Sequence, residues 1–318
     1  MIMLAVAFLL GMILCLLFGV PYIDFLKKKM IGQYVKDCAP EAHAKKQGTP
    51  TTGGVFIILA IILASIIVLA LAQRLTTEAF IILLTLLFYT FAGFQDDYIK
   101  IKGKGNDGLT ARGKLLRQIA IAMLPILYLM MSKTGAGDLT VGHYVLHLGW
   151  LYPIFAVFVI TGASNAYNLT DGLDGLAAST GIFAFAACAI ICLFTGASEA
   201  AIISAVVAGA LAGFLKYNKP KAQVFMGDTG SLALGGFVVS AAYMLKIPLF
   251  IPIVAFIYFI EVLSVIIQVT YYKKTKKRIF KMAPIHHHFE LSGWPETKVV
   301  SIFSIVTAVL CLIGMLAY

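Results

Sequence analysis

Five short polar segments carry nearly all of the side chains that could do chemistry in this chain. They are 45–54 (KKQGTPTTGG), 94–100 (FQDDYIK), 168–175 (NLTDGLDG), 225–231 (FMGDTGS) and 284–290 (PIHHHFE). Long apolar stretches with almost no charge separate these five polar segments. If all five share one face of a membrane, they suit an enzyme that joins a water-soluble molecule to a lipid.

Three aspartates are candidates for metal or acid–base chemistry. Asp96 and Asp97 are adjacent at the end of an apolar run, and Asp228 lies between Gly227 and Gly230. A hard carboxylate beside backbone N–H donors suits a pyrophosphate held with Mg²⁺, and an aspartate facing a cleft can also act as a general base. The alternatives are a solvated helix end for the Asp96–Asp97 pair and an N-cap turn for Asp228.

The segment 168–175 combines Asn168 with Asp171 and Asp174, which are spaced to share a helical face. Helix capping explains one of these side chains, but not all three together. An anion or a nucleotide hydroxyl at a helix start is favoured by free N–H groups. Gly172 and Gly175 would allow a ligand or another helix to approach closely.

Other polar groups are more ambiguous. Three adjacent histidines on a loop cannot easily bind one ion, so phosphate contact or proton transfer is expected of 286–288, with a solvated basic loop as the alternative. Glu261 lies inside an apolar run, where a carboxylate is a functional candidate unless it satisfies a neighbouring helix. Phe225 could stack on a base or pack in the core.

The elements that must position these groups are membrane helices. The 318 residues are 60% hydrophobic and only 13% charged, which indicates an all-α, polytopic membrane protein forming one domain over residues 1–318. We expect ten transmembrane helices, at 3–24, 53–72, 79–95, 115–132, 150–167, 174–194, 198–216, 231–245, 249–271 and 299–317.

The basic residues predict the orientation of these helices. If the N-terminus is outside, all but three of the 25 lysines and arginines fall in inner loops or at the adjoining helix ends; the exceptions are Arg74, Lys133 and Lys246. Basic loops resist translocation, so both termini are expected outside and all five polar segments on the cytoplasmic face. The net charge of +10 therefore reflects topology and the anionic inner leaflet, and it does not indicate nucleic acid.

Several further patterns limit the interpretation. Residues 133–149 alternate as a short outer hairpin would. The five cysteines lie mostly in apolar runs and imply no disulfide framework. The chain has no HExxH, GxGxxG or P-loop pattern, so metalloprotease and dinucleotide-binding classes are excluded.

Taken in order, the motifs are similar to those of a known family. The segments GTPTTGG, DDYIK, NAYNLTDGLDGLA, FMGDTGSLALGG and PIHHHFELSGWPETKVV resemble phospho-N-acetylmuramoyl-pentapeptide transferases, within the polyprenyl-phosphate N-acetylhexosamine-1-phosphate transferase superfamily. The resemblance covers nearly the whole chain. Its first loop and its PIHHHFE segment are the parts most specific to this family.

The resemblance implies a reaction and a set of residues. Phospho-MurNAc-pentapeptide would pass from UDP-MurNAc-pentapeptide to undecaprenyl phosphate with Mg²⁺, giving lipid I and UMP at a bacterial plasma membrane, with a possible homodimer. It implies Asp228 as the Mg²⁺ ligand, and Asp96 as the group that deprotonates or orients the lipid phosphate. The catalytic residues implied are Asp96, Asp97, Asp228, His286 and His287. The substrate-binding residues implied are Lys46, Thr51, Asn168, Asp171, Asp174, Phe225, Gly227, Gln268 and His288.

Three other functions fit parts of the sequence. A sister transferase that uses UDP-GlcNAc would share the aspartate motifs, but not the first loop or PIHHHFE. An ion-coupled transporter would also carry intramembrane carboxylates, although its binding groups would lie near the midplane. A structural scaffold would tolerate substitution in the polar segments.

Overall fold

Membrane-length helices make up almost the whole computed structural model. It describes residues 1–29, 46, 48–103, 107–132, 137–141, 144–244 and 255–316. The helices are α1 (Ile2–Lys28), α2 (Gly54–Leu71), α3 (Thr77–Gly103), α4 (Ala111–Met131), α5 (Tyr152–Thr170), α6 (Leu176–Phe194), α7 (Ser198–Asn218), α8 (Gly227–Met244), α10 (Phe256–Thr275), α11 (Ile285–Glu290) and α12 (Glu296–Leu316). A short 3-10 turn, η2 (Gly149–Leu151), precedes α5.

The described helices confirm the all-α, polytopic membrane fold. Nine of them are long and apolar enough to cross a membrane, and each matches an expected span. The eighth expected span corresponds to α8, an 18-residue helix whose first turn is polar. The pattern of continuous apolar runs therefore located the helices correctly along the part of the chain that is described.

Helix α7 lies at the centre of the bundle. It packs against α1, α2 and α6, and most of its apolar window is buried inside the protein. Helices α3 and α5 both pack along α8. The three polar segments at 94–100, 168–175 and 225–231 lie at the ends of these helices. Many of the buried core side chains are alanine, isoleucine and valine, with leucines and aromatic rings packed among them.

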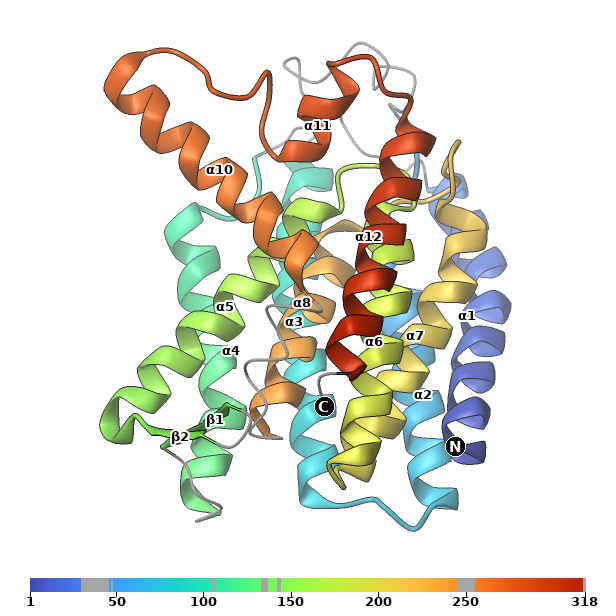
Figure 1. Ribbon diagram of the computed structural model, residues 1–318. Helices are drawn as coiled ribbons and strands as arrows, with labels where there is room; N and C mark the ends of the chain where they lie inside the picture. Colours follow the sequence, from blue (N-terminus) through green and yellow to red (C-terminus); the bar gives the residue numbers. More distant parts are fainter. Residues whose placement is uncertain are drawn as a thin grey trace.

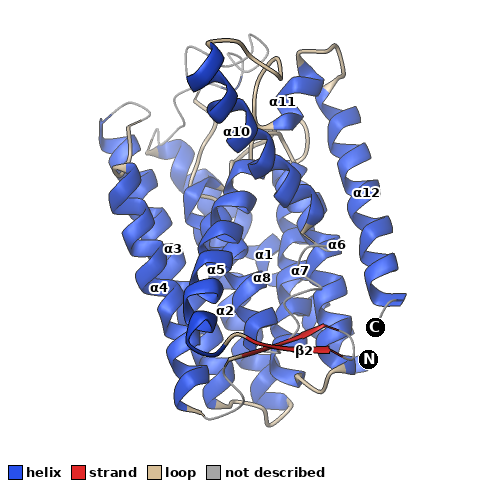
Figure 2. Cartoon of the chain, turned by 60° about the vertical axis from the view of Figure 1, so that its left-hand side comes forward, coloured by secondary structure: helices blue, strands red, loops and turns tan. Residues whose placement is uncertain are grey.

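The two termini lie at one end of the bundle, and α11 lies at the other (Figure 1). Strands β1 (Asp138–Val141) and β2 (Tyr144–His147) pair antiparallel, with Leu139 opposite Leu146. This hairpin confirms the one expected over 133–149, and it lies at the same end as the termini (Figure 2). The described parts of the five polar segments therefore have one end of the molecule in common, opposite the termini and the hairpin.

Two boundaries differ from expectation. The third span was expected to end at residue 95, but α3 continues to Gly103, so Asp96 and Asp97 lie within the helix. An ion pair between Asp96 and Lys100, one turn apart, supports this extension. The histidines were expected on a loop, but residues 285–290 form the short helix α11.

Candidate active site

A side chain from a different helix caps the first turn of α8. The Asp97 carboxylate, on α3, accepts hydrogen bonds from the backbone N–H groups of Asp228 (3.1 Å) and Thr229 (2.9 Å), and from the Thr229 hydroxyl (2.6 Å). Helix N-termini leave backbone N–H groups unpaired and favour negative charge. Asp97 is therefore a buried anchor between α3 and α8.

The anchor depends on a very close crossing of α3 and α8. A Cβ atom added to Gly93, one turn before Asp97, would lie 2.1 Å from the carbonyl oxygen of Asp228. Any larger residue would separate the two helices. Gly93 thus allows the α3 carboxylates to reach the start of α8.

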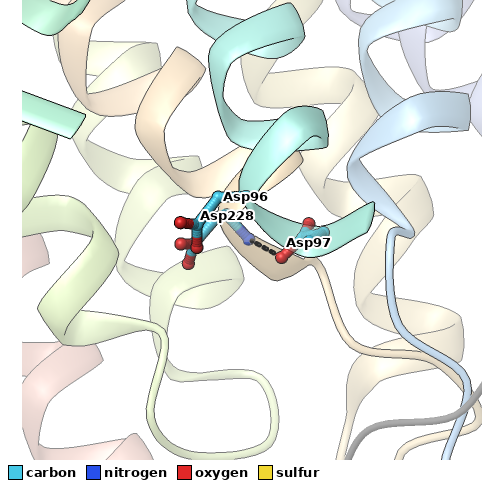
Figure 3. Close-up of side chains that lie close together, drawn as sticks. All are labelled: Asp96, Asp97 and Asp228. Carbon is cyan, nitrogen blue, oxygen red and sulfur yellow. Dashed lines mark hydrogen bonds between the residues drawn. The ribbon is translucent and has the colours of Figure 1, made fainter. Parts of the chain in front are cut away.

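Asp96, Asp97 and Asp228 form one acidic cluster. Each offers an oxygen that lies within 4.8 Å of those of the other two. Figure 3 shows the carboxylates of Asp96 and Asp228 side by side, whereas Asp97 is directed to the α8 backbone. Adjacent residues on a helix point about 100° apart, which explains why Asp96 and Asp97 have different surroundings.

Two lysines neutralise part of this cluster. Lys100 Nζ lies 2.5 Å from Asp96 and 3.0 Å from Asp228, and Lys114 Nζ lies 2.7 Å from Asp228. Asp96 also accepts a hydrogen bond from the backbone N–H of Leu109 (2.7 Å). The cluster contains three carboxylates and two lysines, so it has one carboxylate more than it has lysines. The atoms that it offers as metal ligands are all oxygens.

This donor set fits a divalent cation such as Mg²⁺. The carboxylate of Asp97 accepts from backbone N–H groups at the start of α8, which cannot turn away from it. Asp96 and Asp228 pair with lysine side chains, which can move aside for a cation, so these two carboxylates are the better candidates to hold the ion. The sequence prediction of Asp228 as the metal ligand stays a prediction.

The last turn of α5 and the residues that follow it border the acidic cluster. Asn168 Nδ2 donates to Asp228 Oδ1 and to Ser231 Oγ, both at 2.7 Å. Burial, followed by the negative charges of Asp228, Asp97 and Asp174, raises the pKa of Asp171 well above its usual value. The structure thus brings Asn168 and Asp171 to the same centre as Asp228.

Asp174 belongs to a second, adjoining group. Lys46 Nζ contacts Asp174 Oδ1 (2.7 Å) and Glu296 Oε1 (2.6 Å), and the same Glu296 oxygen accepts from the Asp174 backbone N–H (2.6 Å). Burial lowers the pKa of Lys46, but the two carboxylates outweigh burial and raise it overall. The first loop, the 171–175 segment and α12 are thereby joined.

The first loop also runs beside the segment that precedes α8. Phe225 N–H donates to the Pro50 carbonyl (2.8 Å), and Gly53 N–H donates to the Phe225 carbonyl (2.8 Å). Thr51 is buried near Gly227, because a Cβ atom on that glycine would lie 3.1 Å from the Thr51 hydroxyl. Residues 45 and 47 of the first loop lie outside the described part of the chain.

The three histidines have three different environments. His286 is 1% exposed, and its Nδ1 lies 3.0 Å from Glu261 Oε2. His287 Nδ1 lies 2.7 Å from Glu290 Oε2, and His288 Nδ1 accepts from the Lys281 backbone N–H (3.1 Å). A direct phosphate contact by His286 stays a prediction, and in this structure the ring is enclosed.

Gln268 holds the chain that returns after α10. Its side-chain oxygen accepts from the N–H groups of Ile279 and Phe280, and its amide nitrogen donates to the Phe280 carbonyl, all at 3.0 Å. The side chain therefore serves the backbone here, and its predicted contact with substrate stays a prediction.

Sequence reasoning did not identify Lys100, Lys114, Glu296 or Thr229 as members of the site. Lys100 could have been found, because it lies one turn after Asp96. The other contacts join segments more than 100 residues apart, and no local spacing reports such pairs.

Comparisons with known proteins agree on one family. Residues 79–246 match the family described as Glycosyl transferase family 4. A protein of Clostridium novyi is 44% identical over 311 residues, covering 97% of this chain and 95% of the relative. Relatives from Bacillus subtilis (43% over 310 residues) and Bacillus pumilus (42% over 308 residues) each cover 96% of this chain and 95% of their own length.

All three relatives are named phospho-N-acetylmuramoyl-pentapeptide-transferase. Their similarity spans the first loop, the acidic cluster and the histidine helix, because it covers nearly the full length of both chains. The chain belongs to the phospho-N-acetylmuramoyl-pentapeptide transferase family.

Proposed function

We propose that this protein transfers phospho-MurNAc-pentapeptide from UDP-MurNAc-pentapeptide to undecaprenyl phosphate. An oxygen of the lipid phosphate attacks the phosphorus that carries the sugar. The bridging P–O bond breaks, UMP leaves, and lipid I forms. The observation that carries the proposal is the acidic and lysine-bearing centre of Asp96, Asp228, Lys100 and Lys114, in a chain similar over 97% of its length to a protein named phospho-N-acetylmuramoyl-pentapeptide-transferase.

The charges of the centre suit phosphoryl transfer between two anions. Lys100 and Lys114 bind carboxylates here, and both can turn to phosphate oxygens when substrates arrive. Asp96, which borders Lys100, is the group that we assign to orient or deprotonate the lipid phosphate. Asp97 keeps the start of α8 in place, and thus positions Asp228.

Asp228 and Asp96 are the side chains that would hold Mg²⁺. When bound, the ion supplies positive charge that polarises the pyrophosphate and neutralises charge developing on its oxygens. Asn168 orients the Asp228 carboxylate through its side-chain amide.

We assign the remaining polar groups to the donor. Asp171, Asp174, Lys46 and Thr51 line the adjoining region, and Phe225 with Gly227 borders it from the α8 side. We assign His287 and His288, on α11, to the donor as well. The proposed location is the bacterial plasma membrane, with this end of the bundle facing the cytoplasm, and the basic residues at the adjoining helix ends support that orientation.

The test is UMP release by purified protein. We expect release to require undecaprenyl phosphate, UDP-MurNAc-pentapeptide and Mg²⁺ together, and Asp228→Ala to remove it by at least about 100-fold while the protein stays folded. Wild-type rates in Asp228→Ala would contradict the role of that carboxylate. Equal turnover of UDP-GlcNAc would contradict the donor assignment.

One outcome would change the class of protein, and a separate measurement tests the oligomeric state. Solute uptake into liposomes under an ion gradient, with no UMP released, would favour a transporter. The family also leads us to expect a homodimer, which light scattering of the detergent-solubilised protein would detect as twice the chain's mass.

A further inference from the structure

A carboxylate and an imidazole are buried together between α10 and α11. Glu261 is 0% exposed and His286 is 1% exposed, and their nearest atoms lie 3.0 Å apart. Within the described residues, neither oxygen of Glu261 and neither ring nitrogen of His286 has a hydrogen bond of acceptable geometry. Burying such groups costs free energy, and losing one partner costs more because the other is left uncompensated.

The other side of the His286 ring faces the segment that carries Asp171 and Asp174. A Cβ atom added to Gly172 would lie 2.4 Å from Nε2 of His286 and 2.8 Å from Cε1. No other atom group is that close to the added Cβ, and Gly172 does not have a positive φ. Among the described residues, the three atoms nearest to a methyl group at residue 172 therefore all belong to the His286 ring.

Helix α10 contacts the chain that follows it at two points. Glu261 and Gln268 are seven residues apart, so they lie on the same face of α10. Gln268 binds the backbone at residues 279 and 280, and Glu261 meets His286 at the start of α11. The face of α10 that carries Glu261 and Gln268 thus sets where α11 lies.

We propose that Glu261 is a positioning residue for donor binding, acting through His286. It orients the imidazole with Nδ1 toward α10 and Nε2 against Gly172, as carboxylates orient histidines in other sites. The ring then acts as a spacer that holds the 171–174 segment at a set distance from α11. This inference rests on the proposed function, because Asp171 and Asp174 are there assigned to the donor.

The experiment compares Glu261→Gln and Gly172→Ala with Ser264→Ala. Ser264 is a matched control, since it is buried on α10 but its hydroxyl donates to the Glu261 carbonyl within the same helix. We expect the first two variants to raise KM for the UDP-linked donor about 10- to 100-fold. KM for the lipid phosphate should not change, and Ser264→Ala should match wild type. Simple destabilisation would lower the active fraction without changing either KM.

A second readout does not depend on activity. Trp294 stacks on Phe289 of α11, with ring centroids 4.8 Å apart, so its fluorescence reports the packing of that helix. The only other tryptophan, Trp150, is 77% exposed and can be replaced by phenylalanine. In that background, Glu261→Gln and Gly172→Ala should both shift Trp294 emission, and Gly172→Ala should cause no further shift once His286→Ala has removed the ring.

Wild-type emission and wild-type donor KM in both variants would overturn the inference. An equal Gly172→Ala shift with and without His286 would also overturn it, because the added methyl group would then act elsewhere. If the parent protein released no UMP, the proposed function would fail, while the emission shifts would still decide whether Glu261 and Gly172 act through His286.

Discussion

Asp96 and Asp97 are adjacent in the sequence, but their carboxylates contact different groups. Asp97 accepts three hydrogen bonds from the start of α8, whereas Asp96 pairs with Lys100 beside Asp228. The Asp97 carboxylate holds the start of α8 in place, and the Asp96 carboxylate lies beside Asp228, where the proposed reaction takes place. The two roles differ because consecutive residues of α3 point about 100° apart around the helix.

This division predicts different consequences for the two aspartates. Asp97→Ala leaves the buried N–H and hydroxyl of Thr229 and the partly buried N–H of Asp228 without their acceptor, at a cost of up to about 1–3 kcal/mol each in the free energy of unfolding. We expect a clearly lower thermal midpoint in detergent, together with loss of UMP release. Asp96→Asn keeps an acceptor for the Leu109 N–H, so it should lose UMP release with a midpoint near wild type.

Exposed Asp107, replaced by Asn, is the control for charge removal near the site. Equal midpoints for the Asp96 and Asp97 variants would show that the cap contributes nothing measurable to stability.

The roles predicted for the site residues stay predictions, but local motifs indicated some of the residues that lie together in the structure. Asp228 and Asn168 were predicted in the same site, and the structure joins them by a hydrogen bond. The cap by Asp97 could not be predicted, because the contact spans 131 residues and depends on how α3 crosses α8. The Glu261–His286 pair was hidden for the same reason, although the position of Glu261 in an apolar run marked it as unusual.

At the scale of elements, helix ends determine which segments meet. Hydropathy located the spans well, because apolar residues are continuous through the membrane. It placed the end of α3 too early, since charged residues in the last two turns lower hydropathy without breaking the helix. The polar helix α11 was missed because it has only six residues and no apolar period.

The first turn of α12 predicts a local effect on the 171–175 segment. Glu296 accepts hydrogen bonds from Lys46 and from the Asp174 backbone, and hydrogen bonds to charged groups contribute about 1.5–3 kcal/mol. In Glu296→Ala, we expect the amides of residues 171–175 to exchange with deuterium at least about 10-fold faster. Peptide-level mass spectrometry would measure this exchange.

Thr297→Ala is the matched control, because residue 297 is exposed on the same turn of α12. If exchange at 171–175 were unchanged in Glu296→Ala, the segment would be held by the other contacts of Asp174, chiefly the Ala222 N–H.

At the scale of the whole molecule, one end of the bundle carries the chemistry and the other carries both termini (Figure 1). The last turns of α1, α3 and α10 contain lysines, and they lie at the end of the bundle that carries the acidic cluster, called here the chemical end. A lipid phosphate reaches such an end from the leaflet without crossing the apolar core, and a nucleotide reaches it from water. The arrangement therefore requires only that this end face the compartment that supplies the nucleotide.

That requirement predicts the result of labelling from each side of the membrane. Cysteine can replace Lys281, which is exposed at the chemical end, or Trp150, which is exposed beside the hairpin at the opposite end. Four native cysteines are buried, and Cys38 would be replaced by serine to give a quiet background. A membrane-impermeant maleimide should label Lys281→Cys in inverted vesicles and leave it unlabelled in intact spheroplasts, since basic loops stay on the cytoplasmic side. Trp150→Cys should show the reverse pattern, and labelling of both from the same side would contradict either the orientation or the separation of the two ends.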